Sequence, residues 1–90
     1  MVVKAASGDD LRRALDALAD AGHGMGPQWH AAHDIAQAHE GEAAFDWLHA
    51  LCHRIEGDAW NAGYWYRRAD RAAWDGPFED EADALRASAL

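Results

Sequence analysis

Histidine is the residue type in this sequence with the most evident capacity for chemistry, with six copies in 90 residues. His49 and His53 are four positions apart in a segment that we predict to be helical, so their rings share one face. Cys52 and Glu56 extend this face at steps of three and four. Imidazole and carboxylate groups at such spacing can bind one transition-metal ion, of which zinc is the most common example.

A second polar face lies earlier in the chain, on the predicted helix that contains His33. Its members are His30, His33, Asp34 and Gln37. If the two helices lie side by side, His33 can point toward His49 or His53. The pattern therefore predicts a candidate metal site with the residues His33, His49, His53 and Glu56. We favour the interpretation that the histidines are structural, with ring nitrogens bonded to neighbouring carboxylates or backbone carbonyls, and that the protein has no cofactor. A bound transition metal such as zinc is the alternative.

The sequence offers little that is typical of an enzyme. It lacks the H-E-x-x-H signature of zinc proteases and the paired E-x-x-H motifs of di-iron bundles. Ser7 and Ser88 lie near the ends of the chain, and we expect Cys52 to pack in the core as a small hydrophobic residue. We therefore predict no catalytic residue and no enzymatic activity, with a metal-dependent enzyme as the alternative.

Aromatic and arginine side chains form a second candidate site. At helical steps of four and three, one face carries Trp60, Tyr64, Arg67, Arg71 and Trp74. These residue types dominate the energetic centres of protein interfaces, and arginine can hold carboxylates. We predict that four of them contact a protein or peptide partner: Trp60, Tyr64, Arg67 and Arg71.

The acidic C-terminal segment gives this face an intramolecular alternative. Phe78, Ala82 and Leu85 form an apolar stripe. Four carboxylates accompany the stripe: Glu79, Asp80, Glu81 and Asp83. The segment can fold back, with its apolar groups on the tryptophans and its carboxylates on the arginines. A covered face and a partner-binding face both remain open at this point.

Composition predicts an all-α fold in a single domain of residues 1–90. The chain has 22 alanines but only two valines, two isoleucines and no threonine, so residues that favour strands are scarce. A net charge of -8 argues against nucleic acid and anionic membranes as partners. A single cysteine cannot form an internal disulfide, and no segment resembles a signal peptide or a membrane span. We therefore expect a cytoplasmic protein.

Glycine and proline divide the chain into five predicted helices joined by short loops. Ser7 and Asp9 or Asp10 can cap the first helix, and Gly22 and Gly57 are typical helix stops. The predicted helices cover about residues 9–21, 27–40, 42–56, 58–75 and 78–88. Short connections favour antiparallel neighbours.

Part of the sequence repeats with a shift of 31 residues, which aligns Gly26 with Gly57 and Trp29 with Trp60. The turn Glu56-Gly57-Asp58 and the series Ala62, Tyr66 and Ala69 resemble the helical hairpin of tetratricopeptide repeats. The resemblance covers roughly residues 27–74. It implies about two degenerate repeats of antiparallel hairpins, capped by the C-terminal helix, that bind a protein or peptide.

Two further expectations follow from the repeat. Fewer than three such repeats bury too little apolar surface alone, so we expect a homodimer. The segment His53–Ala69 is also similar to a stretch found in small uncharacterised bacterial proteins, which implies no activity.

The sequence thus favours a non-enzymatic module that binds a protein or a small ligand. A metal-binding protein, or a metal-dependent enzyme using the histidine cluster, is the alternative.

Overall fold

Five α-helices make up all of the regular structure in the described part of the chain, as expected for a sequence rich in alanine and leucine. The computed structural model describes the backbone of residues 2–90 and the side chains from residue 7 onward. The helices are α1 (Val2–Asp20), α2 (Pro27–Ala38), α3 (Ala43–Glu56), α4 (Ala59–Arg68) and α5 (Phe78–Ala89). The all-α prediction is confirmed. Among the described residues, no helix combines the length and the apolar character needed to cross a membrane.

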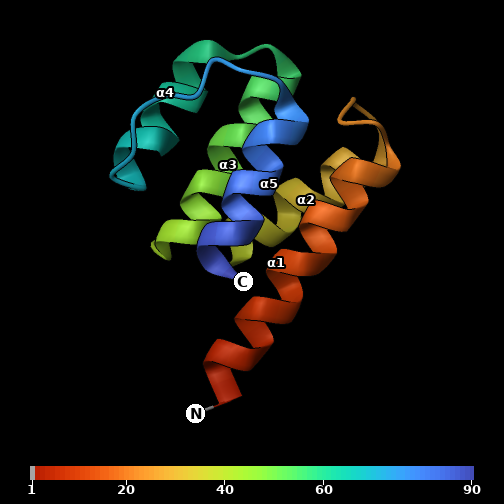
Figure 1. Ribbon diagram of the computed structural model, residues 1–90, viewed down its shortest axis with the longest axis vertical. Helices are drawn as coiled ribbons and strands as arrows, with labels where there is room; N and C mark the ends of the chain where they lie inside the picture. The colour runs from red at the N-terminus through yellow and green to blue at the C-terminus, as the bar shows by residue number, and fades with distance from the viewer. Residues whose placement is uncertain (1) are drawn as a thin grey trace.

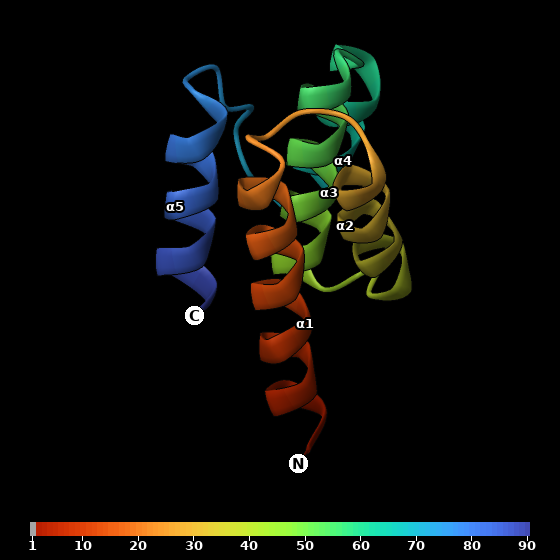
Figure 2. The ribbon, with the colours of Figure 1, turned by 90° about the vertical axis from the view of Figure 1, so that its right-hand side faces the viewer.

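The helices are arranged around α3. Figure 1 shows α1, α2, α3 and α4 running alternately up and down, and α5 returning antiparallel to α3. In Figure 2, α1 and α3 lie between α5 on one side and α2 and α4 on the other. Helix α3 packs against α2, α4 and α5, and α1 packs against α2 and α5. An ion pair of 3.0 Å between Arg86 and Asp16 also joins α5 to α1.

Leucine and tryptophan side chains fill the core between these helices. Trp47 and Trp65 are buried, as their large apolar area predicts. Cys52 is fully buried, which confirms its predicted role as a small core residue. Burial raises the pKa of its thiol to about 12. The fully buried leucines lie on α1, α3 and α5: Leu11, Leu15, Leu18, Leu48, Leu51 and Leu85.

Helix α1 begins earlier than predicted. It extends from Val2, so Ser7, Asp9 and Asp10 lie inside the helix and are not its caps. Serine and aspartate are typical helix caps, which is why the start of the helix was predicted near residue 9. In the structure, the side chains of Ser7 and Asp10 form hydrogen bonds to other parts of the chain. Asp10 accepts from His39, and the Ser7 hydroxyl donates to Glu42.

Helix α4 ends at Arg68, not near residue 75 as predicted. Asp70 adopts a left-handed conformation with φ of 57°. Its N–H donates to the carbonyl of Arg67, and the N–H of Arg71 donates to the carbonyl of Tyr66. This is the Schellman pattern that ends a helix, with aspartate where glycine is usual. The chain then has no helix until Phe78.

A buried carboxylate fixes α5 against α3 and α4. The side chain of Glu81 is inaccessible to solvent. It accepts hydrogen bonds from the Trp47 indole at 2.9 Å, the Tyr66 hydroxyl and the Arg54 guanidinium. Burial, together with the hydrogen bond to Glu81, raises the pKa of Tyr66 and keeps its hydroxyl a donor. The charge of Glu81 is thus compensated by one cation and two neutral donors.

We expect Glu81→Ala to lower the free energy of unfolding by about 3–5 kcal/mol, because it leaves one partly buried cation and two buried donors without their acceptor. Urea unfolding followed by circular dichroism measures the change. Glu79→Ala is the matched control, since this exposed carboxylate lies in the same helical turn, and its effect should stay within about 0.5 kcal/mol. Equal losses in the two variants would contradict the role assigned to Glu81.

Candidate metal-binding site

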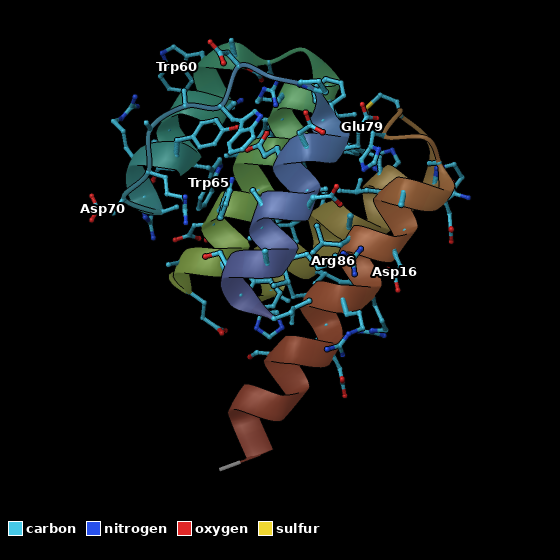
Figure 3. All side chains as sticks on the ribbon, in the orientation of Figure 1. Asp16, Trp60, Trp65, Asp70, Glu79 and Arg86 are labelled. Atoms are coloured by element: carbon cyan, nitrogen blue, oxygen red, sulfur yellow. The ribbon has the colours of Figure 1, made fainter. Side chains whose placement is uncertain are left out.

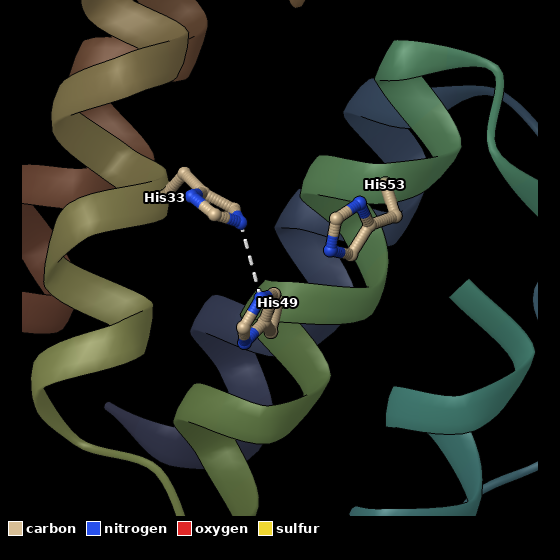
Figure 4. Close-up of side chains that lie close together, drawn as sticks. All are labelled: His33, His49 and His53. Carbon is tan, nitrogen blue, oxygen red and sulfur yellow. Dashed lines mark hydrogen bonds between the residues drawn. The ribbon is translucent and has the colours of Figure 1, made fainter. Parts of the chain in front are cut away.

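Three histidine side chains meet between α2 and α3. His33 comes from α2, whereas His49 and His53 occupy successive turns of α3. Figure 4 shows the three rings pointing toward one another across the helix pair. The register of the two helices is fixed nearby by the Trp29 indole, which donates to the carbonyl of Cys52 at 2.8 Å. The predicted convergence of His33 with the α3 histidines is therefore present.

The ring nitrogens in this cluster lie near one another, and those of His33 and His49 are the nearest pair whose distance is known. The Nε2 atoms of His33 and His49 are 3.1 Å apart. One ring nitrogen from each of the three histidines lies within 4.8 Å of the others. His53 stacks on His49, with ring centroids 5.0 Å apart and an angle of 20° between the planes.

Glu56 is hydrogen-bonded to His53 on the side of the ring that faces away from the other two histidines. Its Oε1 atom is 2.8 Å from Nδ1 of His53, which leaves Nε2 of that ring free of this contact. Glu56 was predicted as a fourth ligand, and the structure instead pairs it with the far nitrogen of a candidate ligand. Asp58 is also near, but its carboxylate caps α4 by accepting from the backbone N–H of Asn61.

Two indole rings wall the cluster. Trp29 stacks on His33, with ring centroids 4.8 Å apart and planes at 11°. Trp65 stacks on His49, with centroids 3.8 Å apart and planes at 13°. The His49 residue is only 2% exposed, whereas His33 and His53 are partly exposed. The cluster is thus closed on the side of His49 and Trp65, and the part of it that meets solvent is at His33 and His53.

Burial holds two of the rings in their neutral form. Burial, reinforced by His33 and His53, lowers the pKa of His49 to about 3. Burial, together with the nearby His53, also lowers the pKa of His33 below its ordinary value. Nδ1 of His49 is buried and has no hydrogen-bond partner among the described residues. A neutral ring whose Nε2–H donates to His33 places an unprotonated nitrogen there, which avoids an unpaired buried N–H.

The other residues of the predicted α2 face lie outside this cluster. His30, Asp34 and Gln37 are exposed. His39, at the end of α2, is structural. Its nitrogens are 2.8 Å from Asp10 and 2.7 Å from Glu42. Burial opposes its charge, but these two carboxylates outweigh burial and raise the pKa of His39.

The predicted aromatic and arginine face is only partly continuous. Trp60 is 76% exposed and Tyr64 is 38% exposed on α4, and Arg67 is exposed beside them. Figure 3 shows Trp60 at the outer edge of α4, whereas Trp65 lies toward α3. Arg71 lies beyond the end of the helix, with its guanidinium carbon 3.6 Å from the ring centroid of Trp47. Arg71 therefore departs from the predicted face.

Helix α5 does not cover this face. It packs on α3 and α1, and its carboxylate Glu81 binds Arg54, not the arginines of α4. Of the two open alternatives, a cover over Trp60, Tyr64 and Arg67 is not found, whereas Arg71 donates a hydrogen bond of 3.4 Å to the Ser88 hydroxyl of α5. Whether Trp60, Tyr64 and Arg67 contact a partner stays a prediction.

No family model, no curated protein and no solved structure matches this chain. The resemblance to tetratricopeptide repeats stays a prediction. Function is therefore inferred from the geometry of the chain itself.

Acid should destabilise the fold through His49. The pKa of His49 is lower in the folded state than in the unfolded chain, so its contribution is complete above the ordinary histidine pKa and is lost as pH falls. Between pH 6.5 and pH 5, the free energy of unfolding should drop by about 2 kcal/mol from this residue. His33 acts in the same direction, and His39 acts in the opposite one.

Urea unfolding at several pH values tests this expectation. His49→Phe keeps an aromatic ring against Trp65 but removes the titrating group, so its stability should fall less between pH 6.5 and pH 5 than that of the wild type. His30→Ala, at an exposed position, should keep the wild-type slope. A wild-type slope in His49→Phe would contradict the assignment.

Proposed function

We propose that this protein binds one transition-metal ion, such as zinc, through His33, His49 and His53. The observation that carries the proposal is the 3.1 Å separation of the Nε2 atoms of His33 and His49. Two nitrogens bound to a tetrahedral zinc at 2.0–2.1 Å are about 3.3 Å apart. These two nitrogen atoms are thus close to the separation that they would have on a bound ion.

The protonation state of the cluster supports the proposal. Metal binding needs the neutral imidazole, because the ion and the proton compete for one lone pair. The lowered pKa values of His33 and His49 keep both rings neutral at the pH of most cells. Imidazole ligands suit zinc, copper and nickel, so the donor set points to this group of ions.

His53 completes the set after a change of ring orientation. Its ring now lies nearly parallel to that of His49, so it must turn out of this stack to aim Nε2 at the same ion. Glu56 on its Nδ1 atom then acts as the outer carboxylate that commonly orients a metal-bound histidine.

A second candidate function is association with a second copy of the chain through α4. The observation that favours it is the 76% exposure of Trp60, next to Arg67 and Arg68. A chain with a net charge of -8 offers these arginines abundant carboxylates, for example Glu79 and Asp80 in the exposed first turn of α5. Charge complementarity therefore favours a second copy as the occupant of this face.

We expect tag-free protein to bind one Zn²⁺ per chain in isothermal titration calorimetry. His33→Ala and His53→Ala should each weaken binding at least 100-fold, because each removes one of three ligands. Glu56→Gln should weaken it about 10–100-fold by removing the outer carboxylate. His30→Ala is the matched control, since this exposed histidine lies one turn from His33 and should leave the affinity unchanged.

The pH dependence of the same titration provides an independent check. Because the pKa values of His33 and His49 are lowered, protons should displace the ion from these two ligands only below about pH 6.5. Circular dichroism establishes that each variant is folded. Absence of stoichiometric binding at neutral pH, or an equal loss in His30→Ala, would rule the metal site out.

For the second candidate, sedimentation velocity should reveal a dimer that forms as protein concentration rises and weakens as salt rises. Trp60→Ala should raise the dissociation constant at least tenfold, since it removes the aromatic anchor. Met25→Ala is the control, because Met25 is 51% exposed but lies in the loop between α1 and α2. A monomer at every concentration would contradict this candidate.

A further inference from the structure

The histidine cluster supplies three ligands, which is one fewer than a tetrahedral metal ion takes. Among the described residues, His33, His49 and His53 are the three side chains that come together there. Residues 1–6, whose side chains are not described, include no histidine, cysteine, aspartate or glutamate. Zinc and related ions take four ligands in most protein sites, and three protein ligands leave one position for an exogenous molecule.

The side chains nearest to the cluster are already engaged elsewhere. The Glu56 carboxylate is held by Nδ1 of His53. Asp58 accepts from both the backbone and the side chain of Asn61. The Cys52 side chain is fully buried in the core, and its sulfur is not among the ligand atoms that come together in the cluster.

The two indoles that wall the site close the remaining directions without supplying a ligand. Trp29 and Trp65 lie flat against His33 and His49, and an indole ring has a donor N–H but no lone pair for a metal. The partly exposed rings of His33 and His53 leave the approach from solvent on their side. A fourth ligand therefore has to come from solvent, past these two residues.

The charge of the site determines which kind of ligand it favours. Three neutral imidazoles leave the full double positive charge of the ion without compensation by its own ligands. In sites with thiolate or carboxylate ligands, the protein neutralises that charge itself. A small monodentate anion is thus favoured over a neutral molecule at the open position.

We propose that the metal ion held by His33, His49 and His53 keeps an exchangeable fourth position, where it binds small monodentate anions in place of water. This inference rests on the proposed metal-binding function. It goes further by naming the ligand class of the bound ion, and it is tested separately below.

The experiment uses tag-free protein loaded with Co²⁺, whose visible absorption reports the number and type of its ligands, and azide as the probe anion. We expect azide to change the spectrum saturably, with one azide bound per ion, and dialysis to restore the original spectrum. His30→Ala should respond as the wild type does, since this residue is exposed and outside the cluster.

Cys52→Ala decides between an open and a closed site. A thiolate-to-metal band in the wild type that disappears in Cys52→Ala would show that Cys52 fills the fourth position, and it would overturn the inference. Identical Co²⁺ spectra in the two proteins, with the same azide response, are the expected result.

The two proposals fail in different ways. Stoichiometric Co²⁺ binding without any spectral response to azide would overturn the open position and leave metal binding intact. Failure of both Co²⁺ and Zn²⁺ to bind would overturn the metal site and this inference together.

Discussion

Helix α3 is buried without interruption from Phe45 to Cys52, and the rest of the structure depends on this constraint. A helix covered on all sides has no solvent to satisfy its polar side chains, so each of them needs a partner on another element. Asp46 accepts from the backbone N–H of Gly41, and Trp47 donates to Glu81. His49 pairs with His33. These contacts set where the surrounding elements can lie.

The same constraint explains why the histidines meet. Helix α2 is positioned on α3 by the bond from Trp29 to the carbonyl of Cys52, and His33 lies one turn after Trp29. One turn along an antiparallel neighbour leads from Cys52 back to His49. The cluster thus follows from the register of two helices, and not from a flexible loop. Its three histidines are on helices, which favours a defined geometry.

The sequence predicts the periodic features well and the tertiary ones poorly. Spacing alone placed His49 and His53 on one face, and Gly57 marked the end of α3. The end of α4 was missed because alanines after Arg68 favour a helix, whereas the left-handed Asp70 stops it. Glu81 was grouped with its exposed acidic neighbours. Its position four residues before Leu85, on the apolar face of α5, was the signal of burial.

The buried polar groups differ in whether hydrogen bonds within the fold explain their burial. Glu81 has three donors around it, so its structural role explains its burial. The histidine cluster has one hydrogen bond between His33 and His49 and another between His53 and Glu56, and the buried Nδ1 atom of His49 has no partner among the described residues. A leucine at position 49 would fill similar space in a thin core without desolvating a polar ring. Imidazole at this position therefore needs a reason other than packing, and the ion that we propose is such a reason. An ion on Nε2 of His49 moves the proton of this ring to Nδ1, so metal binding has to outweigh one unpaired buried N–H.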